Sequence, residues 1–336
     1  LTVPFAFFAD IFFPDSAPHT SAIFTGDLGF DKFTQELRLV STSNQSFEWI
    51  VGAYYTSEDG HNSQVLDIIP PVDLFYADFP SNYDELSLYG TGTYYFTPDF
   101  DASAGVRYSD YSNDVRLDVK GPLVAPIPLT KIDDKVTNWL FNLRYRANAN
   151  TAFYGRIASG YRPGGANFVL LDPQGNPLTN AFFQPDSLWS YEFGVKGTSE
   201  DGLLTYDAAL FYIDWQDYQI NVTIAGLNVA GNANKAVSKG GEVSLALAAT
   251  EALTLTGTFS YIDAKLAADE PNLGARDGEQ LPDSPKWQIV LDAQYDFSLG
   301  EHPAYAGIGW FYKGETPVGF SGYTEDGVYY PPSAPR

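Results

Sequence analysis

The strongest constraint in this chain is a repeated alternation of apolar and polar residues over segments of about ten positions. In one such segment, Trp139, Phe141 and Leu143 alternate with Asn142 and Arg144. A side-chain period of two belongs to a β-strand, because successive side chains of a strand point to opposite faces. The pattern returns along most of the sequence, so we predict an all-β fold.

The two faces of these predicted strands differ in a way that indicates their surroundings. One face is aliphatic in the middle and aromatic at the ends, whereas the other carries charge. An apolar band between aromatic girdles is typical of a strand that crosses lipid, and charge on the other face suits a wet or plugged interior. We therefore expect lipid-facing side chains at Trp139, Phe141, Leu143, Trp189, Phe193, Ile289 and Leu291, and interior-facing ones at Arg144, Glu192 and Asp292.

The connections between the predicted strands alternate between tight turns and long loops. Such alternation is typical of a transmembrane up-and-down antiparallel β-barrel of the bacterial cell outer membrane, in which short turns face the periplasm and long loops face outside. A soluble propeller or β-solenoid also has many strands, but neither explains aromatic residues at the strand ends of an apolar face. We predict a wall of about twelve strands, at residues 33–41, 47–57, 84–96, 101–112, 135–147, 151–161, 188–198, 203–215, 237–249, 253–264, 286–298 and 303–314. The predicted long loops are 60–83, 113–134, 162–187, 216–236 and 265–285, and residues 1–30 would belong to another.

Composition excludes several classes of function. The net charge of −23 argues against a nucleic-acid partner, which needs a basic face. The absence of cysteine excludes disulfides, thiolate metal sites and cysteine nucleophiles. The three histidines, His19, His61 and His302, lack metal-ligand spacing, and no catalytic motif is present. We therefore predict no enzymatic activity, no cofactor and no bound metal.

Acidic side chains gather in two of the predicted long loops. One interpretation is that they keep exposed loops soluble. The other is that they attract a cationic or metal-bearing ligand. The acids concerned are Glu58, Asp59, Asp67, Asp73 and Asp78 in the first loop, and Asp263, Asp269, Glu270, Asp277, Glu279 and Asp283 in the second.

Several short motifs occur in a fixed order across residues 33–297. Each one is a short aromatic strand and is unspecific by itself, but the order is specific. In that order they resemble the TonB-dependent outer-membrane receptors, particularly the large set found in sphingomonads and their relatives. The motifs are FTQELRL at 33–39, YGRIASGYRPGG at 154–165, WSYEFGVKG at 189–197, ALFYIDW at 209–215, GNA at 231–233 followed by GGE at 240–242, and LPDSPKW at 281–287.

The resemblance implies that this chain is part of a larger barrel. Receptors of this family have 22 strands around an N-terminal plug that carries a TonB box, and the predicted strands correspond to about strands 8 to 19. Residues 1–336 would then be a partial barrel domain without the plug and the last strands. Because an unpaired sheet edge in hydrocarbon costs several kcal/mol per bare group, strands 33–41 and 303–314 should pair with segments outside this sequence and not with each other.

The resemblance also implies a function. The family's receptors bind a scarce ligand outside and import it when the TonB–ExbB–ExbD system pulls on the plug. Their usual small-molecule ligands are ferric siderophores, with cobalamin, haem and oligosaccharides as alternatives, and lipid and lipopolysaccharide surround the barrel. Two other hypotheses remain, a passive or secretory pore without a plug and a structural component of a larger membrane assembly.

Three sets of residues are candidates for the site. Arg162 closes a predicted strand at the outer rim, where it either pins the strand end and packs against a plug or contacts ligand. The aromatic residues Tyr76, Phe79, Phe182 and Phe183 lie in predicted outer loops and either bind ligand or pack the loops together. The third set contains charged residues at the alternating strand positions expected to face the barrel interior. They are expected to hydrogen-bond a plug, because buried charges need partners. They are Arg38, Arg107, Arg144, Arg156, Glu192, Lys196 and Glu242.

Overall fold

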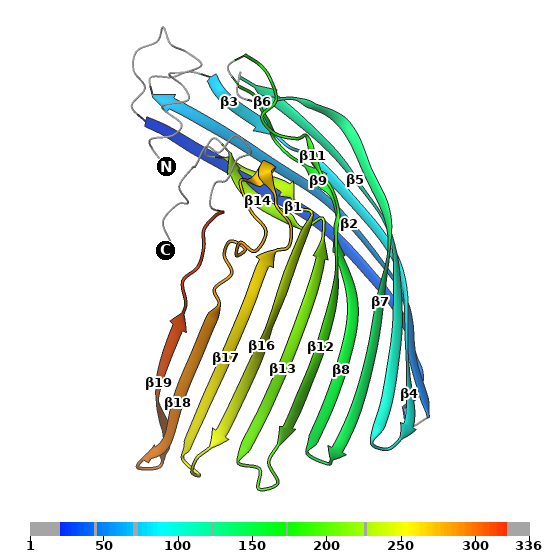
Figure 1. Ribbon diagram of the computed structural model, residues 1–336, viewed down its shortest axis with the longest axis vertical. Coiled ribbons are helices and arrows are strands. Elements are labelled where there is room, and N and C mark those ends of the chain that lie inside the picture. Colours follow the sequence, from blue (N-terminus) through cyan, green and yellow to red (C-terminus); the bar gives the residue numbers. More distant parts are fainter. Residues whose placement is uncertain are drawn as a thin grey trace.

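The computed structural model describes residues 21–43, 46–69, 73–121, 124–172, 174–224 and 227–320. Its dominant feature is one open, curved, antiparallel sheet in which strands adjacent in sequence are adjacent in space (Figure 1). Twelve long strands follow each other up and down, as predicted, and the short strand β3 joins them at one end. They are β1 (Ser21–Val40), β2 (Phe47–Ile69), β3 (Asp73–Asp78), β4 (Ser81–Thr97), β5 (Phe100–Lys120), β7 (Ile127–Asn148), β8 (Thr151–Arg162), β12 (Asp186–Thr198), β13 (Leu204–Gln216), β16 (Lys235–Ala248), β17 (Leu253–Leu266), β18 (Trp287–Leu299) and β19 (His302–Lys313).

Cross-strand register gives the sheet one polar and one apolar face from end to end. Leu143 lies opposite Ala102 on β5 and Gly155 on β8, whereas the next residue, Arg144, lies opposite Asp101. Directly opposed residues share a face. Followed across the ladders, the seven side chains expected to face lipid share the first face, and Arg144, Glu192 and Asp292 share the second. The predicted separation of faces is therefore confirmed.

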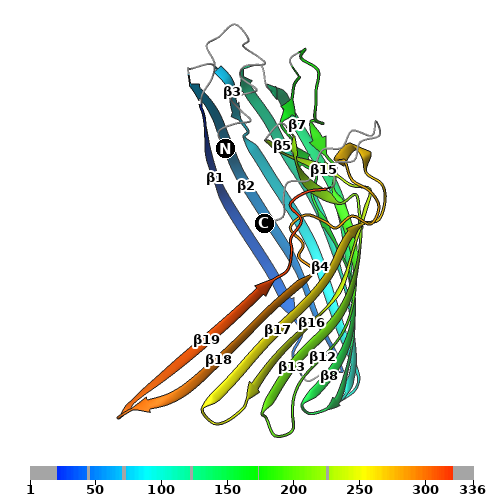
Figure 2. The ribbon, with the colours of Figure 1, turned by 60° about the vertical axis from the view of Figure 1, so that its left-hand side comes forward.

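The two outermost strands of the sheet remain apart. Within the described residues, β1 is paired only with β2 and β19 only with β18. Figure 2 shows the separation, with β18 and β19 leaning away from β1 at the turn end. The expectation that the first and last strands do not pair with each other is confirmed, and the sheet is a wall and not a closed barrel.

The two ends of the wall differ in their connections. One end, here called the turn end, carries tight turns such as 98–99, 149–150 and 200–202. The other, the loop end, carries the long connections and the small elements β6 (Val124–Ala125), β9 (Gly165–Ala166), β10 (Val169–Leu170), β11 (Phe182–Phe183), β14 (Gln219–Ile224), β15 (Leu227–Asn232) and the 3₁₀ turn Pro271–Leu273.

Strand lengths at the loop end correct the sequence prediction. Residues 21–30, expected in a loop, continue β1, and its ladder with β2 extends to the pair Ser21 and Ile69. Much of the predicted loops 60–83 and 113–134 is also strand. At the loop end the strands contact water or small hydrophobic cores instead of one apolar surrounding along a whole face, so the regular apolar alternation that reveals strands is lost while backbone pairing continues.

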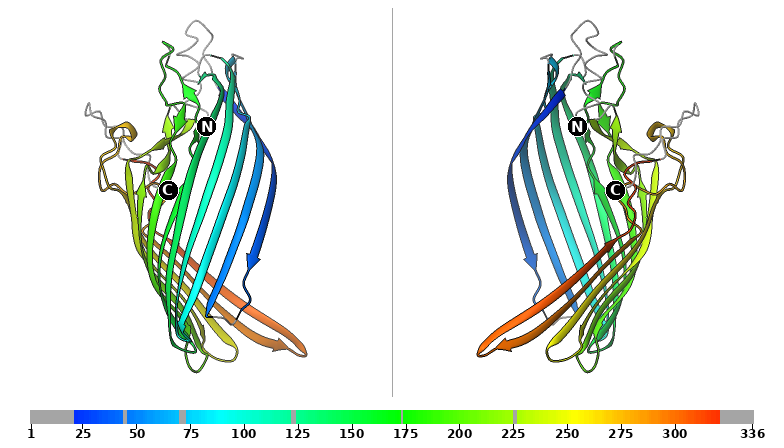
Figure 3. Two further views of the ribbon diagram at one scale, coloured as in Figure 1. Left: turned by 90° about the vertical axis from the view of Figure 1, so that its right-hand side faces the viewer. Right: turned by 90° about the vertical axis from the view of Figure 1, so that its left-hand side faces the viewer.

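The two small hydrophobic cores of the described residues lie at the loop end and not along the wall. One small core contains Leu66, Leu117, Val124 and Leu170, and a second contains Leu266. We call the described residues of 61–80, 113–134, 163–185, 217–234 and 267–286 the cap; Figure 3 shows the cap segments gathered at this end. In the described part of the chain, no helix is long and apolar enough to cross a membrane.

Candidate functional site

The polar face of the wall is covered with ion pairs between neighbouring strands. Arg107 Nη2 lies 3.0 Å from Glu85 Oε1, and its guanidinium lies 5.0 Å from the ring centroid of Tyr54. Asp101 is almost completely buried between Arg144, at 3.0 Å, and Arg146, at 2.9 Å. These ion-pair partners come from adjacent strands, so the charges concerned are paired within the wall itself.

All seven charged residues expected on the interior face share this polar face. Arg38 pairs with Glu36 at 3.6 Å, and Lys196 pairs with Asp207 at 2.9 Å. Arg156 lies directly opposite Glu192 in the β8–β12 ladder. Glu242 accepts a hydrogen bond from Ser260 Oγ at 3.4 Å, while Arg107 and Arg144 have the partners given above. Their contact with a plug stays a prediction.

A shallow hollow of about 470 Å³ lies on this face. Arg38, Arg107 and Arg156 line it together with Glu36, Tyr89 and Asn138, and with Ile50 of β2 its lining residues come from six strands. A hollow that spans six strands fits a sheet that curves toward this face. We therefore infer that the polar face is the concave face of the wall.

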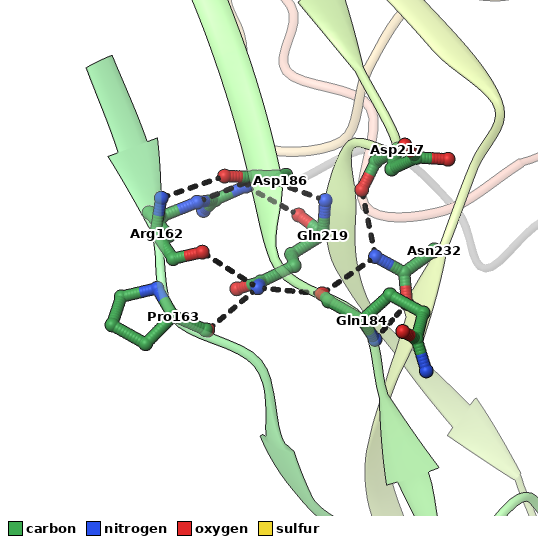
Figure 4. Close-up of polar contacts among 7 residues, drawn as sticks. All are labelled: Arg162, Pro163, Gln184, Asp186, Asp217, Gln219 and Asn232. Carbon is green, nitrogen blue, oxygen red and sulfur yellow. Dashed lines mark hydrogen bonds and ion pairs between the residues drawn. The ribbon is translucent and has the colours of Figure 1, made fainter. Parts of the chain in front are cut away.

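Arg162 stands at the loop end in a dense polar cluster (Figure 4). Its guanidinium donates two hydrogen bonds to Asp186 Oδ2, one of them at 2.9 Å from Nε, and its backbone N–H donates to Asp186 Oδ1 at 3.1 Å. A further N–H donates to the carbonyl of Gln219 at 2.9 Å. The same guanidinium lies 5.2 Å from the ring centroid of Trp215 and 5.4 Å from that of Tyr218.

The carboxylate of Asp186 is the centre of this cluster. Its side chain is 1 % exposed, whereas that of Arg162 is 45 % exposed. Besides the contacts from Arg162, Asp186 accepts a hydrogen bond from the backbone N–H of Gln219 at 3.0 Å. Burial raises the pKa of neighbouring Tyr218, which Arg162 partly offsets, so that phenol is neutral at physiological pH. The cluster therefore holds one buried, fully paired carboxylate.

The β14–β15 hairpin is attached to the wall through the same cluster. Gln219 Nε2 donates to the carbonyls of Pro163, at 2.8 Å, and Gln184, at 2.9 Å. Asn232, opposite Gln219 in the hairpin ladder, donates from Nδ2 to the Gln184 carbonyl at 3.0 Å and accepts from the Gln184 N–H at 2.8 Å. The base of the hairpin is thus hydrogen-bonded to the segment that leads into β12.

The four candidate aromatic residues occupy different surroundings. The Lys120 ammonium lies 5.3 Å from the ring centroid of Tyr76. Phe79 packs against the first small core and lies 6.0 Å from the ring of Phe168. Phe182 packs against the same core. A Cβ atom added to Gly165 would lie only 2.5 Å from the ring of Phe183. Gly165, the second glycine of the Arg-Pro-Gly-Gly sequence, therefore leaves space for the Phe183 ring.

Two of these aromatic residues line the larger hollow of the cap. It has a volume of about 880 Å³ and lies between the segment 177–184 and strand β15. Phe182, Phe183 and Gln184 contribute from one side, and Ala230 and Asn232 from the other. Phe183 also lines a smaller hollow of about 200 Å³ together with Phe79. Tyr76 and Arg162 line neither hollow, and no ionisable side chain lines the larger one.

Several acidic residues of the two predicted acidic loops have structural partners. Glu58 is paired with Lys32, and Asp263 Oδ1 lies 2.9 Å from Lys265 Nζ. Glu270 is 5 % exposed and accepts hydrogen bonds from Asn234, at 2.6 Å from its backbone N–H and at 3.2 Å from its side chain. Within the described ranges no three His, Asp or Glu side chains lie close enough together to hold a metal ion.

Sequence reasoning missed the residues that organise the cap. Asp186, Gln219 and Asn232 were not predicted as site residues, and Glu270 was considered only as one acid of a long loop. Each of the four makes contacts between distant segments. One sequence signal could have indicated Asp186. Its carboxylate comes just before the predicted strand 188–198, and that strand was expected to lie beside the strand that ends near Arg162. Nothing in the sequence marks the two amides as partners of Gln184.

Comparison with protein families identifies one profile along the chain. The family described as "TonB dependent receptor-like, beta-barrel" matches residues 6–334. That range includes every strand of the wall and the whole described cap.

Comparison with individual proteins gives distant relatives that are named as receptors. The Catecholate siderophore receptor Fiu of Escherichia coli (strain UTI89) is 26% identical over 345 residues, which cover 91% of this chain and 42% of Fiu. The Metal-pseudopaline receptor CntO of Pseudomonas aeruginosa (strain UCBPP-PA14) is 30% identical over 175 residues, 51% of this chain and 22% of CntO. The chain thus spans less than half the length of these relatives.

Among solved structures, the ferric yersiniabactin uptake receptor FyuA from Yersinia pestis superposes with a TM-score of 0.76. The match covers 91% of this chain and 46% of FyuA at 19% sequence identity, so it is a likeness of fold alone. Roughly half of that receptor's chain thus has the arrangement of the wall described above.

Proposed function

We propose, because this chain belongs to the TonB-dependent receptor-like β-barrel family, that it is the central wall of an active importer of a metal-chelating small molecule. Membership makes it an outer-membrane protein and not an enzyme. The loop end then faces outside and the turn end the periplasm. Energy would come from TonB–ExbB–ExbD, acting through a plug held against the concave polar face.

A ferric siderophore is the ligand class we favour. Fiu and CntO are named as receptors for a catecholate siderophore and for metal-pseudopaline, and both are related to this chain along much of its length. The uncharged cap hollow suits the organic part of such a chelate, because ligand sites combine aromatic walls with a few polar groups. The relatives named above come from Escherichia and Pseudomonas, so they lend no support to a sphingomonad-type subgroup.

One observation supports an importer over a passive pore. Strands β1 and β19 have no ladder between them in the described residues, although twelve strands are enough to close a small pore. An open wall of twelve strands fits part of a wider barrel, which needs a plug to prevent leakage. A secretory pore or a structural barrel component would share the wall but would not depend on TonB.

Iron uptake by the full-length protein tests the proposal. It would be expressed in Escherichia coli lacking its own catecholate receptors, and uptake of radioactive iron would be measured with ferric catecholate, hydroxamate and mixed chelates. We expect saturable uptake of at least one chelate that stops when TonB is deleted. Uptake of small solutes that is unsaturable and independent of TonB would instead favour the passive pore.

A further inference from the structure

The β14–β15 hairpin leaves the wall at a hinge that is held from two sides. Asp217, which has φ of 52°, directs the chain off β13, and its N–H donates to the Asn234 carbonyl at 2.9 Å. A non-glycine residue in the left-handed region is uncommon and conformationally strained. Such a conformation persists only where surrounding contacts over-determine it.

Two buried carboxylates supply those contacts. Asp186 binds the first residue of the hairpin through the Gln219 N–H at 3.0 Å. On the other side Glu270, from the 267–286 segment, binds Asn234 through two hydrogen bonds. Hydrogen bonds to a charged acceptor contribute more than neutral ones, and a buried carboxylate that loses its donors is strongly destabilised. The hinge therefore has a defined geometry.

The position of this hairpin determines the shape of the larger cap hollow. Ala230 and Asn232 of β15 form one side, while Phe182, Phe183 and Gln184 form the other. The two sides meet at the Gln184 backbone, to which the side-chain amides of Gln219 and Asn232 are hydrogen-bonded. If the hairpin swings at its hinge, the hollow loses one side.

From this arrangement we propose that Asp186, held by Arg162, is a positioning residue that keeps the β14–β15 hairpin in place and the uncharged cap hollow preformed. The hollow would receive the neutral aromatic or amide part of the chelate, a statement that rests on the proposed function. Arg162 acts through Asp186 and not by direct contact, since it does not line the hollow. Preformed sites bind more tightly because less ordering remains to be done on binding.

A spin-label distance in the full-length protein tests the positioning role without any ligand. The labels would be attached to cysteines at Asn221, on the hairpin, and Leu129, an exposed residue of β7, since these 336 residues contain no other cysteine. The wild-type cap should give one narrow distance distribution. Asp186→Asn keeps the side-chain shape but removes the charge, and it should give a broad distribution while the wall still assembles.

The matched control is Asp214→Asn at the same rim. Asp214 pairs with Lys235 at 3.1 Å and has no contact with the hairpin cluster in the described residues. This control should leave the distribution narrow. If Asp186→Asn prevents assembly, Arg162→Lys provides the test, because lysine keeps the charge but cannot make the forked contact; it should broaden the distribution partly. A narrow distribution in the assembled variant would overturn the proposal.

Binding of a defined probe tests the consequence for the hollow. The probe is the ferric tris-catecholate complex of N-methyl-2,3-dihydroxybenzamide, whose amide is neutral, titrated against wild type and Asp186→Asn. If the hairpin is in place about a tenth of the time in the variant, its affinity should fall about tenfold. A broadened distribution with unchanged affinity would overturn the link between hairpin and hollow. If wild type binds no ferric chelate, the proposed function fails while the distance result still decides the positioning role.

Discussion

The wall and the cap show similar exposed leucines that meet different surroundings. Leu143 on the apolar face of the wall is 54% exposed, and Leu178 in the cap is 47% exposed. The first faces hydrocarbon in a membrane barrel and the second faces water. Accessible area alone therefore does not measure how a residue contributes to stability, because the hydrophobic effect acts only where water is the alternative.

The polar contacts of the two regions also differ in their range. On the wall, Arg144 and Arg146 meet Asp101 on the next strand. In the cap, Arg162 and Gln219 bring together three segments. A wall contact follows from the register of two strands, whereas a cap contact needs several chain segments to arrive together. The wall should consequently tolerate local changes on its polar face better than the cap tolerates loss of a buried partner.

The largest expected effect is a difference in folding stability between arginine substitutions at the two exposed leucines. Leu143→Arg places a charge in the hydrocarbon layer near its middle and should cost about 2–4 kcal/mol. Leu178→Arg places the same charge in water and should have almost no effect. Folding into lipid vesicles, followed by the heat-dependent shift on gel electrophoresis, measures both. Equal, normal assembly of the two variants would mean that the face assignment of the wall is reversed.

A smaller effect should be confined to the cap. Leu170 is fully buried in the first small core. Leu170→Ala leaves a cavity there and should destabilise the cap by about 2–3 kcal/mol, in the lower part of the range for buried leucine because thin loops can relax. Leu178→Ala, in the same segment, is the control. Hydrogen exchange should rise in residues 165–183 alone, and faster exchange across the wall strands would show that wall and cap unfold as one unit.

The smallest expected effect concerns one turn of the cap. The Asn176 side-chain amide, with backbone N–H groups of Asn176 and Gln174, lowers the pKa of Asp172. A lowered carboxyl pKa means that the turn keeps its contacts at neutral pH and loses them only as pH falls below the ordinary value of 3.8. Amide shifts of labelled Asn176 should move in that range, and Asn176→Ala should move the transition upward. A transition near neutral pH would contradict the assignment.

Part of the candidate site could be predicted from sequence and part could not. Arg162 was expected at the outer rim because its strand ends in Pro163, and it lies there. Its partner Asp186 is 24 residues away, and Gln219 is 57 residues away. Phe182 and Phe183 were expected in an outer loop, but only the folded cap brings them opposite β15. Whether they bind ligand stays a prediction.

The sequence by itself determined the wall. Its period of two, its aromatic ends and its alternating connections follow from interactions between neighbouring segments and between each strand and its solvent, so the information is local. The cap was decided by tertiary structure alone. Its side chains meet specific partners far away in the sequence, such as Asn167 and Ala230, which are 63 residues apart. No repeating pattern in the sequence records which loops come together. The ends of the strands in the cap were hidden for a related reason, since the surroundings of each face change along them and only backbone pairing continues without interruption.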